Sequence, residues 1–172
     1  AVRRGLVSSA YNERVQQCRA AAAHFGVSSL RDVSMDVLEA QSSGLDGLIL
    51  KRARHVVSEN QRTLQAVVEL RNGNANAFGR LMNESHASLR DDYEVSCQEL
   101  NVMVDLAGRQ KGCLGARMTG GGFGGCAIAL VQTAWAESFI REVTAAYRQA
   151  VGLTPQIFIC RASAGANLID IV

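Results

Sequence analysis

The sequence predicts an α+β fold in which helices cover a mainly antiparallel sheet of about four strands. Apolar residues recur at helical spacing through most of the region before residue 107, so this region is expected to be largely helical. Beyond it, the pattern changes to short apolar runs, and the late runs are separated by short connections. This order, helices first and closely spaced strands afterwards, favours an antiparallel sheet with helices on one face.

The part of the chain before residue 45 contains one strand-like segment and two helices. Residues 3–7 have the pattern of a strand. Ser9 is a helix-capping residue, and the helix that it starts is expected to continue to His24 and to end at Gly26. Ser34 caps a second, shorter helix.

Three longer helical patterns follow. The first is predicted from Leu45 to Gly73, where glycine supplies the left-handed conformation of a helix end. The same period continues over residues 78–89, in a helix packed against the first. Ser96 and Glu99 stand three residues apart just before the next apolar stripe, which predicts a capping box at the start of a third helix.

The last third of the chain alternates strands with one helix. Residues 114–119 and 126–131 are predicted strands on either side of a glycine-rich loop. A helix is expected over residues 135–150, and two further strands over residues 156–160 and 167–172 close the chain.

Composition indicates the kind of protein. At 172 residues the chain matches one domain, residues 1–172, that can bury a hydrophobic core. A net charge of +2 is too small to indicate a nucleic-acid or membrane partner. No apolar run has the length of a signal peptide or a membrane span, which favours a cytoplasmic protein. The chain begins at Ala1 without Met, as a domain cut from a longer chain would. Five cysteines without a C-x-x-C pair predict reduced, mostly buried thiols.

The run from Gly115 to Cys126, GARMTGGGFGGC, is the most informative stretch. Its glycine spacing matches a dinucleotide fold, but a strand-like run follows where that fold needs a helix. Neither of the two lysines follows the glycines, so a Walker loop is excluded as well. A loop between two strands remains, whose backbone amides could face a charged ligand. The alternative is a close-packed glycine hairpin without a ligand.

The glycine run resembles the third conserved motif of the GHMP kinases, a family that includes galactokinase and homoserine, mevalonate and phosphomevalonate kinases. The residues of this motif are those typical of the galactokinases. Three further segments resemble galactokinase sequences in the same order along the chain: residues 8–18 (SSAYNERVQQC), 52–63 (RARHVVSENQRT) and 84–96 (ESHASLRDDYEVS). The resemblance covers nearly the whole chain. It implies the family's C-terminal domain, of ferredoxin-like type, with the N-terminal domain absent from this chain. The related N-acetylgalactosamine kinases are the alternative.

The activity that the resemblance implies is transfer of the γ-phosphate of ATP to the anomeric hydroxyl of galactose. ATP and Mg²⁺ are the implied cofactors, and galactose, ATP and the chain's own N-terminal domain are the implied partners. The family's phosphate-binding loop, its first motif and the Asp proposed as base match nothing in these residues. We therefore expect no catalytic residue and no metal ligand in this chain, and no kinase activity from it alone. A non-catalytic sugar sensor that acts through a protein partner is a second hypothesis.

Two groups of site residues follow from the same resemblance. Tyr11 matches the family's Tyr that lies against the sugar, although Ala10 stands where an acidic residue commonly precedes it. The glycine loop is expected to shape the active site, with these residues: Arg117, Thr119, Gly120, Gly121, Gly122, Phe123, Gly124 and Gly125. The structural alternatives are an interface role for Tyr11 and a stand-alone interaction module whose loop binds nothing.

The remaining polar residues are interpreted as structural. Asp91 and Asp92 are adjacent on a helix, point about 100° apart, and are expected to be a solvated pair at a helix end. The histidines have no metal-ligand spacing and are expected to be surface or packing residues: His24, His55 and His86. One group of arginines is expected to form a solvated helix face: Arg52, Arg54 and Arg62.

Overall fold

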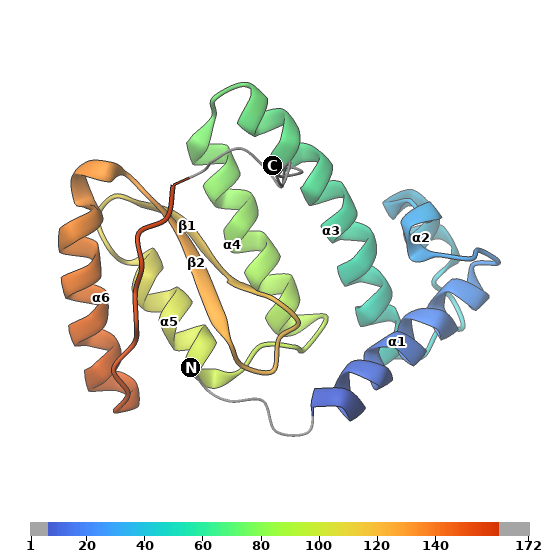
Figure 1. Cartoon of the computed structure of the whole chain (residues 1–172). Helices are drawn as coiled ribbons and strands as arrows, with labels where there is room; N and C mark the ends of the chain where they lie inside the picture. The colour runs from blue at the N-terminus through green and yellow to red at the C-terminus, as the bar shows by residue number, and fades with distance from the viewer. Residues whose placement is uncertain (1–6, 162–172) are drawn as a thin grey trace, which may run out of the picture.

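Six α-helices and one β-hairpin make up the described part of the chain, residues 7–161 of the computed structural model. Figure 1 shows them in a row, from α1 and α2 at one end, through α3 and α4, to the hairpin with α5 and α6 at the other. The fold is α+β, as predicted. No described helix is long and apolar enough to span a membrane.

The first three helices form one end of the molecule. They are α1 (Val7–His24), α2 (Met35–Gln41) and α3 (Gly47–Arg71), with a short 3-10 helix at Leu30–Asp32. The predicted cap of α2 is confirmed, because the Ser34 hydroxyl accepts a hydrogen bond from the Val37 amide at 3.2 Å. Asp46 caps α3.

Helix α4 (Ala75–Asp91) returns antiparallel to α3, and α5 (Gln98–Gly108) and α6 (Ala136–Val151) pack together beside the hairpin. The predicted capping box of α5 is wrong. Cys97 is the N-cap and makes no side-chain cap, while the Ser96 hydroxyl is held 2.7 Å from Oδ1 of Asn101. A 3-10 helix, Thr133–Trp135, leads into α6.

The hairpin consists of β1 (Cys113–Thr119) and β2 (Cys126–Val131), which pair antiparallel with Thr119 opposite Cys126. The outer edge of β1 lies against α4. There the Ala116 amide donates to Oδ1 of Asn83 at 2.8 Å, and the Met118 amide donates to Nδ1 of His86 at 3.2 Å. Side chains of α4 thus satisfy backbone groups that a neighbouring strand would otherwise satisfy.

The helix and the strand cross at a pair of glycines. A Cβ on Gly79 would meet the Leu114 carbonyl, and a Cβ on Gly115 would meet the backbone of Gly79, its Cα at 2.6 Å. The stripe of α4 that faces β1 therefore consists of a glycine, an asparagine and a histidine at helical spacing. This stripe fixes where β1 lies, and with it the loop that leaves its end.

One strand expected near the end of the chain is wrong. Residues 156–160 form no described strand, and Phe158 and Ile159 are 77% and 62% exposed. Only Ile157 of this segment packs against the core. The apolar pattern of residues 156–160 alone could not show that this segment pairs with no strand among the described residues. The strand expected at residues 167–172 lies outside the described range, as do residues 3–6 of the first expected strand. Val7, the last residue of that expected strand, instead begins α1. Ser9 lies inside α1, so the prediction that it caps this helix is wrong.

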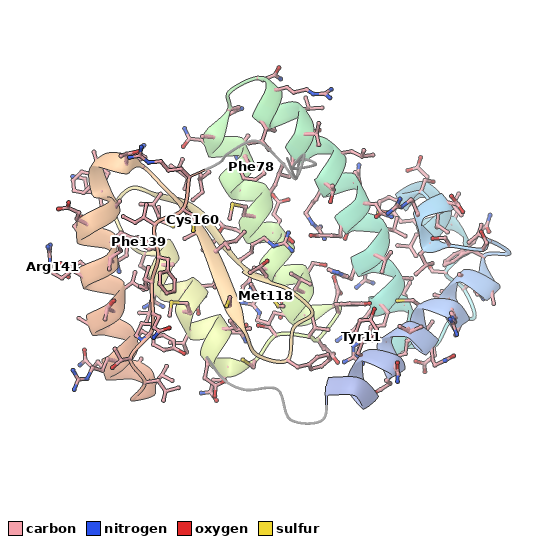
Figure 2. The ribbon with its side chains drawn as sticks, viewed as in Figure 1. Tyr11, Phe78, Met118, Phe139, Arg141 and Cys160 are labelled. Atoms are coloured by element: carbon pink, nitrogen blue, oxygen red, sulfur yellow. The ribbon has the colours of Figure 1, made fainter. Side chains whose placement is uncertain are left out.

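The core has three clusters of buried side chains. One lies between the first helices, and its members are Ala21, Ala22, Leu30, Val33, Leu38, Ala53 and Val57. A second joins α5 and α6 to β1, with Val104, Ala107, Ala116, Phe139 and Val143. The third lies beneath the end of the hairpin, with Leu89, Val95, Leu100 and Met118. Met118 and Phe139 mark the last two clusters in Figure 2. All five cysteines are free; Cys126 and Cys160 are exposed, contrary to the expectation of mostly buried thiols.

Candidate functional site

The glycine loop turns the chain from β1 to β2 through left-handed backbone conformations. Positive φ angles occur at five of its positions, Gly120, Gly122, Phe123, Gly124 and Gly125. Phe123 is the exception among them, because a side chain at φ 59° is strained where glycine is not. A non-glycine residue held there indicates that its surroundings fix the loop.

The middle of the loop rests on Val95, in the connection between α4 and α5. The Phe123 amide donates a hydrogen bond of 2.6 Å to the Val95 carbonyl, and a Cβ on Gly122 would lie 2.7 Å from Cβ of Val95. The Phe123 ring packs against the cluster beneath the hairpin. Phe123 therefore anchors the loop, and the exposed residues at its start, Thr119 to Gly121, are the part open to a ligand.

Arg117 extends away from this exposed part. Its guanidinium donates to Oε1 of Glu59 at 3.2 Å, on α3, and to the Met118 carbonyl at 3.1 Å. Glu59 also accepts from Ser85 at 2.5 Å and from Arg62 at 2.8 Å. Burial raises the pKa of Glu59, but these donors outweigh it and the net pKa is lowered. The charge of Arg117 is thus paired with Glu59 within the fold. Both residues line a cavity of about 260 Å³.

Tyr11 lies on α1, and its side chain is 55% exposed. Figure 2 shows it at the end of α1 nearest the hairpin. Arg14 is three residues further, on the same helix face. Its guanidinium carbon lies 6.0 Å from the centre of the Phe123 ring. Tyr11 thus lies one helical turn from a residue that reaches Phe123 of the glycine loop, although 109 residues separate Tyr11 from Gly120.

The connection between α4 and α5, residues 92–95, is called here the support segment. Arg14 donates to two of its carbonyls, from Nε to Tyr93 at 2.7 Å and from Nη2 to Glu94 at 3.1 Å. Glu94 has a positive φ of 52°, a conformation that a non-glycine residue adopts only where its surroundings hold it. The last carbonyl of the support segment, that of Val95, accepts the hydrogen bond from the glycine loop.

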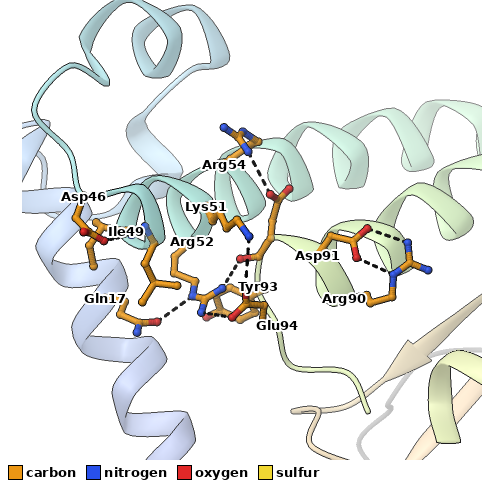
Figure 3. Close-up of polar contacts among 12 residues, drawn as sticks. Gln17, Asp46, Ile49, Lys51, Arg52, Arg54, Arg90, Asp91, Tyr93 and Glu94 are labelled. Atoms are coloured by element: carbon orange, nitrogen blue, oxygen red, sulfur yellow. Dashed lines mark hydrogen bonds and ion pairs between the residues drawn. The ribbon is translucent and has the colours of Figure 1, made fainter. Parts of the chain in front are cut away.

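Arg52 of α3 holds the same segment from another direction (Figure 3). It is 1% exposed and donates to the Asp92 carbonyl at 2.5 Å and to the Glu94 carboxylate at 2.8 Å. Oε1 of Gln17 accepts from Nε of Arg52 at 3.0 Å and from Nη1 of Arg14 at 3.1 Å. The expected solvated face is therefore wrong for Arg52. It is wrong also for Arg62, whose side chain is 16% exposed, whereas the Arg54 side chain is 47% exposed.

Neither Arg14 nor Arg52 is among the site residues predicted from the sequence. One signal was available for Arg52, which lies between Ile49 and Val56 on the apolar stripe of its helix. A buried Arg at such a position needs several acceptors. The acceptors come from residues 35 to 42 positions away, which no local pattern reveals.

The remaining candidates are structural, as expected. His55 donates or accepts at Ser88 Oγ, 2.9 Å away, and stacks on Tyr93 with ring centres 4.4 Å apart. Burial lowers its pKa to about 4. His24 contacts the Gln41 carbonyl at 2.8 Å. Asp91 is a solvated partner of Arg90, whereas the Asp92 side chain is only 21% exposed. Within residues 7–161 no three His, Cys, Asp or Glu side chains gather as metal ligands would.

Comparison with known proteins gives a family match for one segment of the chain. Residues 66–149 match the family model described as GHMP kinases C terminal. The chain is 47% identical to a galactokinase of Roseiflexus sp. (strain RS-1) and 44% identical to one of Clostridium acetobutylicum, each over 98% of this chain. It spans 44% of the length of these curated relatives.

A solved structure agrees with the sequence matches. The crystal structure of Lactococcus lactis galactokinase complexed with galactose superimposes with a TM-score of 0.84 at 44% identity. The match covers 88% of this chain and 40% of that protein. The fold of the chain is accordingly that of the C-terminal part of such kinases, with two described strands where about four were expected.

Proposed function

We propose that this chain is the C-terminal part of a galactokinase, a member of the GHMP kinase family. The intact enzyme would transfer the γ-phosphate of ATP to the anomeric hydroxyl of galactose. The observation that carries the proposal is the likeness, over most of this chain, to a galactokinase whose structure contains galactose. The glycine loop, held by Val95, adds a preorganised backbone at one wall of the proposed cleft.

Tyr11 and the exposed start of the glycine loop are the proposed contacts to the sugar. Tyr11 offers a half-exposed ring and a hydroxyl, which suit the apolar face and the hydroxyl groups of a sugar. The loop offers backbone at Gly120 and Gly121, which are both exposed. Glycine lets a ligand approach this backbone closely, because no Cβ stands in the way.

ATP and Mg²⁺ are assigned to the intact protein. Phosphoryl transfer depends on positioning and on the metal's neutralisation of charge. Mg²⁺ in such enzymes is held by one or two carboxylates together with the phosphates of ATP, and no cluster of three candidate ligands gathers among the described residues. Arg117, a basic residue near the loop, already donates to Glu59. We propose that the N-terminal domain of the intact protein supplies the residues that carry out the transfer. We also propose that the intact protein acts in the cytoplasm.

The test is a coupled assay of ADP release by the intact protein. Galactose should be required for turnover, and the isolated 172-residue chain should show none. Faster turnover with N-acetylgalactosamine than with galactose would transfer the proposal to the related N-acetylgalactosamine kinases. Galactose binding by calorimetry without any turnover would instead favour a sugar sensor.

Substitution of Gly122 distinguishes a site from an interaction module. Gly122→Leu places a side chain against Val95 and should displace the loop. Gly73→Leu is the matched control, because Gly73 also has a positive φ but a Cβ there meets nothing within 4 Å. Unchanged galactose and ATP kinetics in Gly122→Leu would contradict the proposed site.

A further inference from the structure

Arg14 links the two parts of the proposed sugar site. It is 8% exposed and lies on α1 three residues after Tyr11. Its guanidinium holds the carbonyls of Tyr93 and Glu94, one residue before the carbonyl that accepts from Phe123. The helix that bears Tyr11 thus reaches the support segment through Arg14, and also through Cys18, whose Sγ lies 3.7 Å from the Tyr93 hydroxyl.

Arg14 donates its hydrogen bonds to uncharged oxygens rather than to carboxylates. Its only carboxylate neighbour among the described residues is Glu13, 3.7 Å away and with a side chain that is 60% exposed. Its donors instead go to two carbonyls and to the amide oxygen of Gln17. A planar guanidinium with several fixed donors can bridge successive carbonyls, which a lysine ammonium cannot do in the same way.

Arg52 and Gln17 make the arrangement rigid. Gln17 accepts from both arginines, so the two guanidinium groups hold one another in place through it. Arg52 fixes the first carbonyl of the support segment, that of Asp92, and the carboxylate of Glu94. All four carbonyls of the segment are consequently occupied, three by arginine and the fourth by the glycine loop.

We propose that Arg14 is a positioning residue for sugar binding, which sets Tyr11 relative to the glycine loop through the support segment. This inference rests on the proposed function. Without Arg14, α1 keeps its contacts through Gln17 and Cys18 but loses its hydrogen bonds to the Tyr93 and Glu94 carbonyls, so the two sugar contacts no longer keep as fixed a spacing. Small displacements of binding groups are costly because affinity depends on preorganised geometry.

The experiment uses the intact protein with Arg14→Met and Arg14→Lys. The KM for galactose is expected to rise about tenfold or more in Arg14→Met and by about threefold or more in Arg14→Lys, with the KM for ATP within about twofold of the unsubstituted value. Val33→Ala is the control, because it removes core packing near α1 without touching the support segment. It should lower the thermal midpoint and leave the KM for galactose unchanged.

A double-substitution cycle separates positioning from general destabilisation. Tyr11→Ala should raise the KM for galactose in the unsubstituted protein and add little in the Arg14→Met background, since Tyr11 is already displaced there. Additive effects would overturn the proposal, as would an unchanged KM for galactose in Arg14→Met. Absence of galactose-dependent turnover in the unsubstituted protein would instead overturn the proposed function.

If neither variant folds, hydrogen exchange of the unsubstituted intact protein decides. Galactose is expected to slow amide exchange in residues 92–95 together with residues 120–125, because the hydrogen bond from Phe123 to Val95 joins them. Protection confined to the glycine loop would overturn the role assigned to Arg14.

Discussion

The guanidinium of Arg52 lies 2.8 Å from the carboxylate of Glu94, although Arg52 is 1% exposed and the Glu94 side chain is 44% exposed. The two partners therefore stand in different surroundings. Glu94 can exchange its ion pair for water, whereas Arg52 cannot. Hydrogen bonding to Arg52 lowers the pKa of Glu94.

The asymmetry predicts unequal effects of removing either partner. Arg52→Met leaves the buried side of the Asp92 carbonyl without its donor and Oε1 of Gln17 with Arg14 alone, and should cost about 3 kcal/mol or more in the free energy of unfolding. Glu94→Gln keeps an acceptor at a half-exposed position and should cost about 1 kcal/mol or less. Urea unfolding of the intact variants measures both. A larger loss in Glu94→Gln than in Arg52→Met would contradict this account.

The glycine loop allows a comparison of two of its own positions. Gly122→Ala should reduce galactose-dependent kcat/KM by about tenfold or more, because its Cβ would meet Val95 and lift the loop from the support segment. Gly125 also has an unfavourable positive φ, 106° against 84° at Gly122, but its Cβ would meet nothing within 4 Å. The loss in Gly125→Ala should be clearly smaller. Steady-state kinetics of the two variants give the answer, and equal losses would mean that φ alone, rather than contact with Val95, is limiting.

Much of the fold follows from local patterns in the sequence. The apolar period predicted α3 and α4 to within a few residues, and the short apolar runs on either side of the glycines predicted β1 and β2. Caps were less predictable. Ser96 has the right spacing to Glu99, but its hydroxyl is taken by Asn101, so local competition decided the outcome.

The site divides in the same way. The glycine loop stands out in the sequence by its composition, whereas Tyr11 is identified only through the family resemblance. Arg14 and Arg52 do not stand out, because their role depends on carbonyls up to 80 positions away in the chain. A support made of backbone acceptors leaves no residue type to recognise, and only the folded structure brings its parts together.

Stability should depend on pH through the buried His55. Burial lowers its pKa from 6.5 to about 4 in the folded state, so the unfolded chain takes up a proton first as the pH falls. The folded state is therefore stabilised by neutral His55 above pH 6.5, and this contribution is lost between pH 6.5 and about 4. The full shift corresponds to about 3 kcal/mol.

The measurement is the thermal midpoint of the intact protein across this pH range. His55→Gln, which does not titrate, should flatten the decline by removing one proton uptake. The same slope in both proteins would show that His55 does not carry the dependence.

The crossing of α4 over β1 gives the sharpest prediction about the fold. Gly79→Ala would push a methyl group into the Leu114 carbonyl, where neither backbone can yield without breaking the hydrogen bonds that Asn83 and His86 make to β1. We expect a loss of about 3 kcal/mol or more in the free energy of unfolding. Gly108→Ala, at the end of α5 with open space around its Cβ, should instead be neutral or stabilise by up to about 1 kcal/mol. The contrast tests the close approach itself, because both substitutions add the same methyl group to a helix. If Gly79→Ala unfolds at the same urea concentration as Gly108→Ala, β1 does not depend on this helix for its position, and the stripe of Gly79, Asn83 and His86 does not fix the strand that leads into the glycine loop.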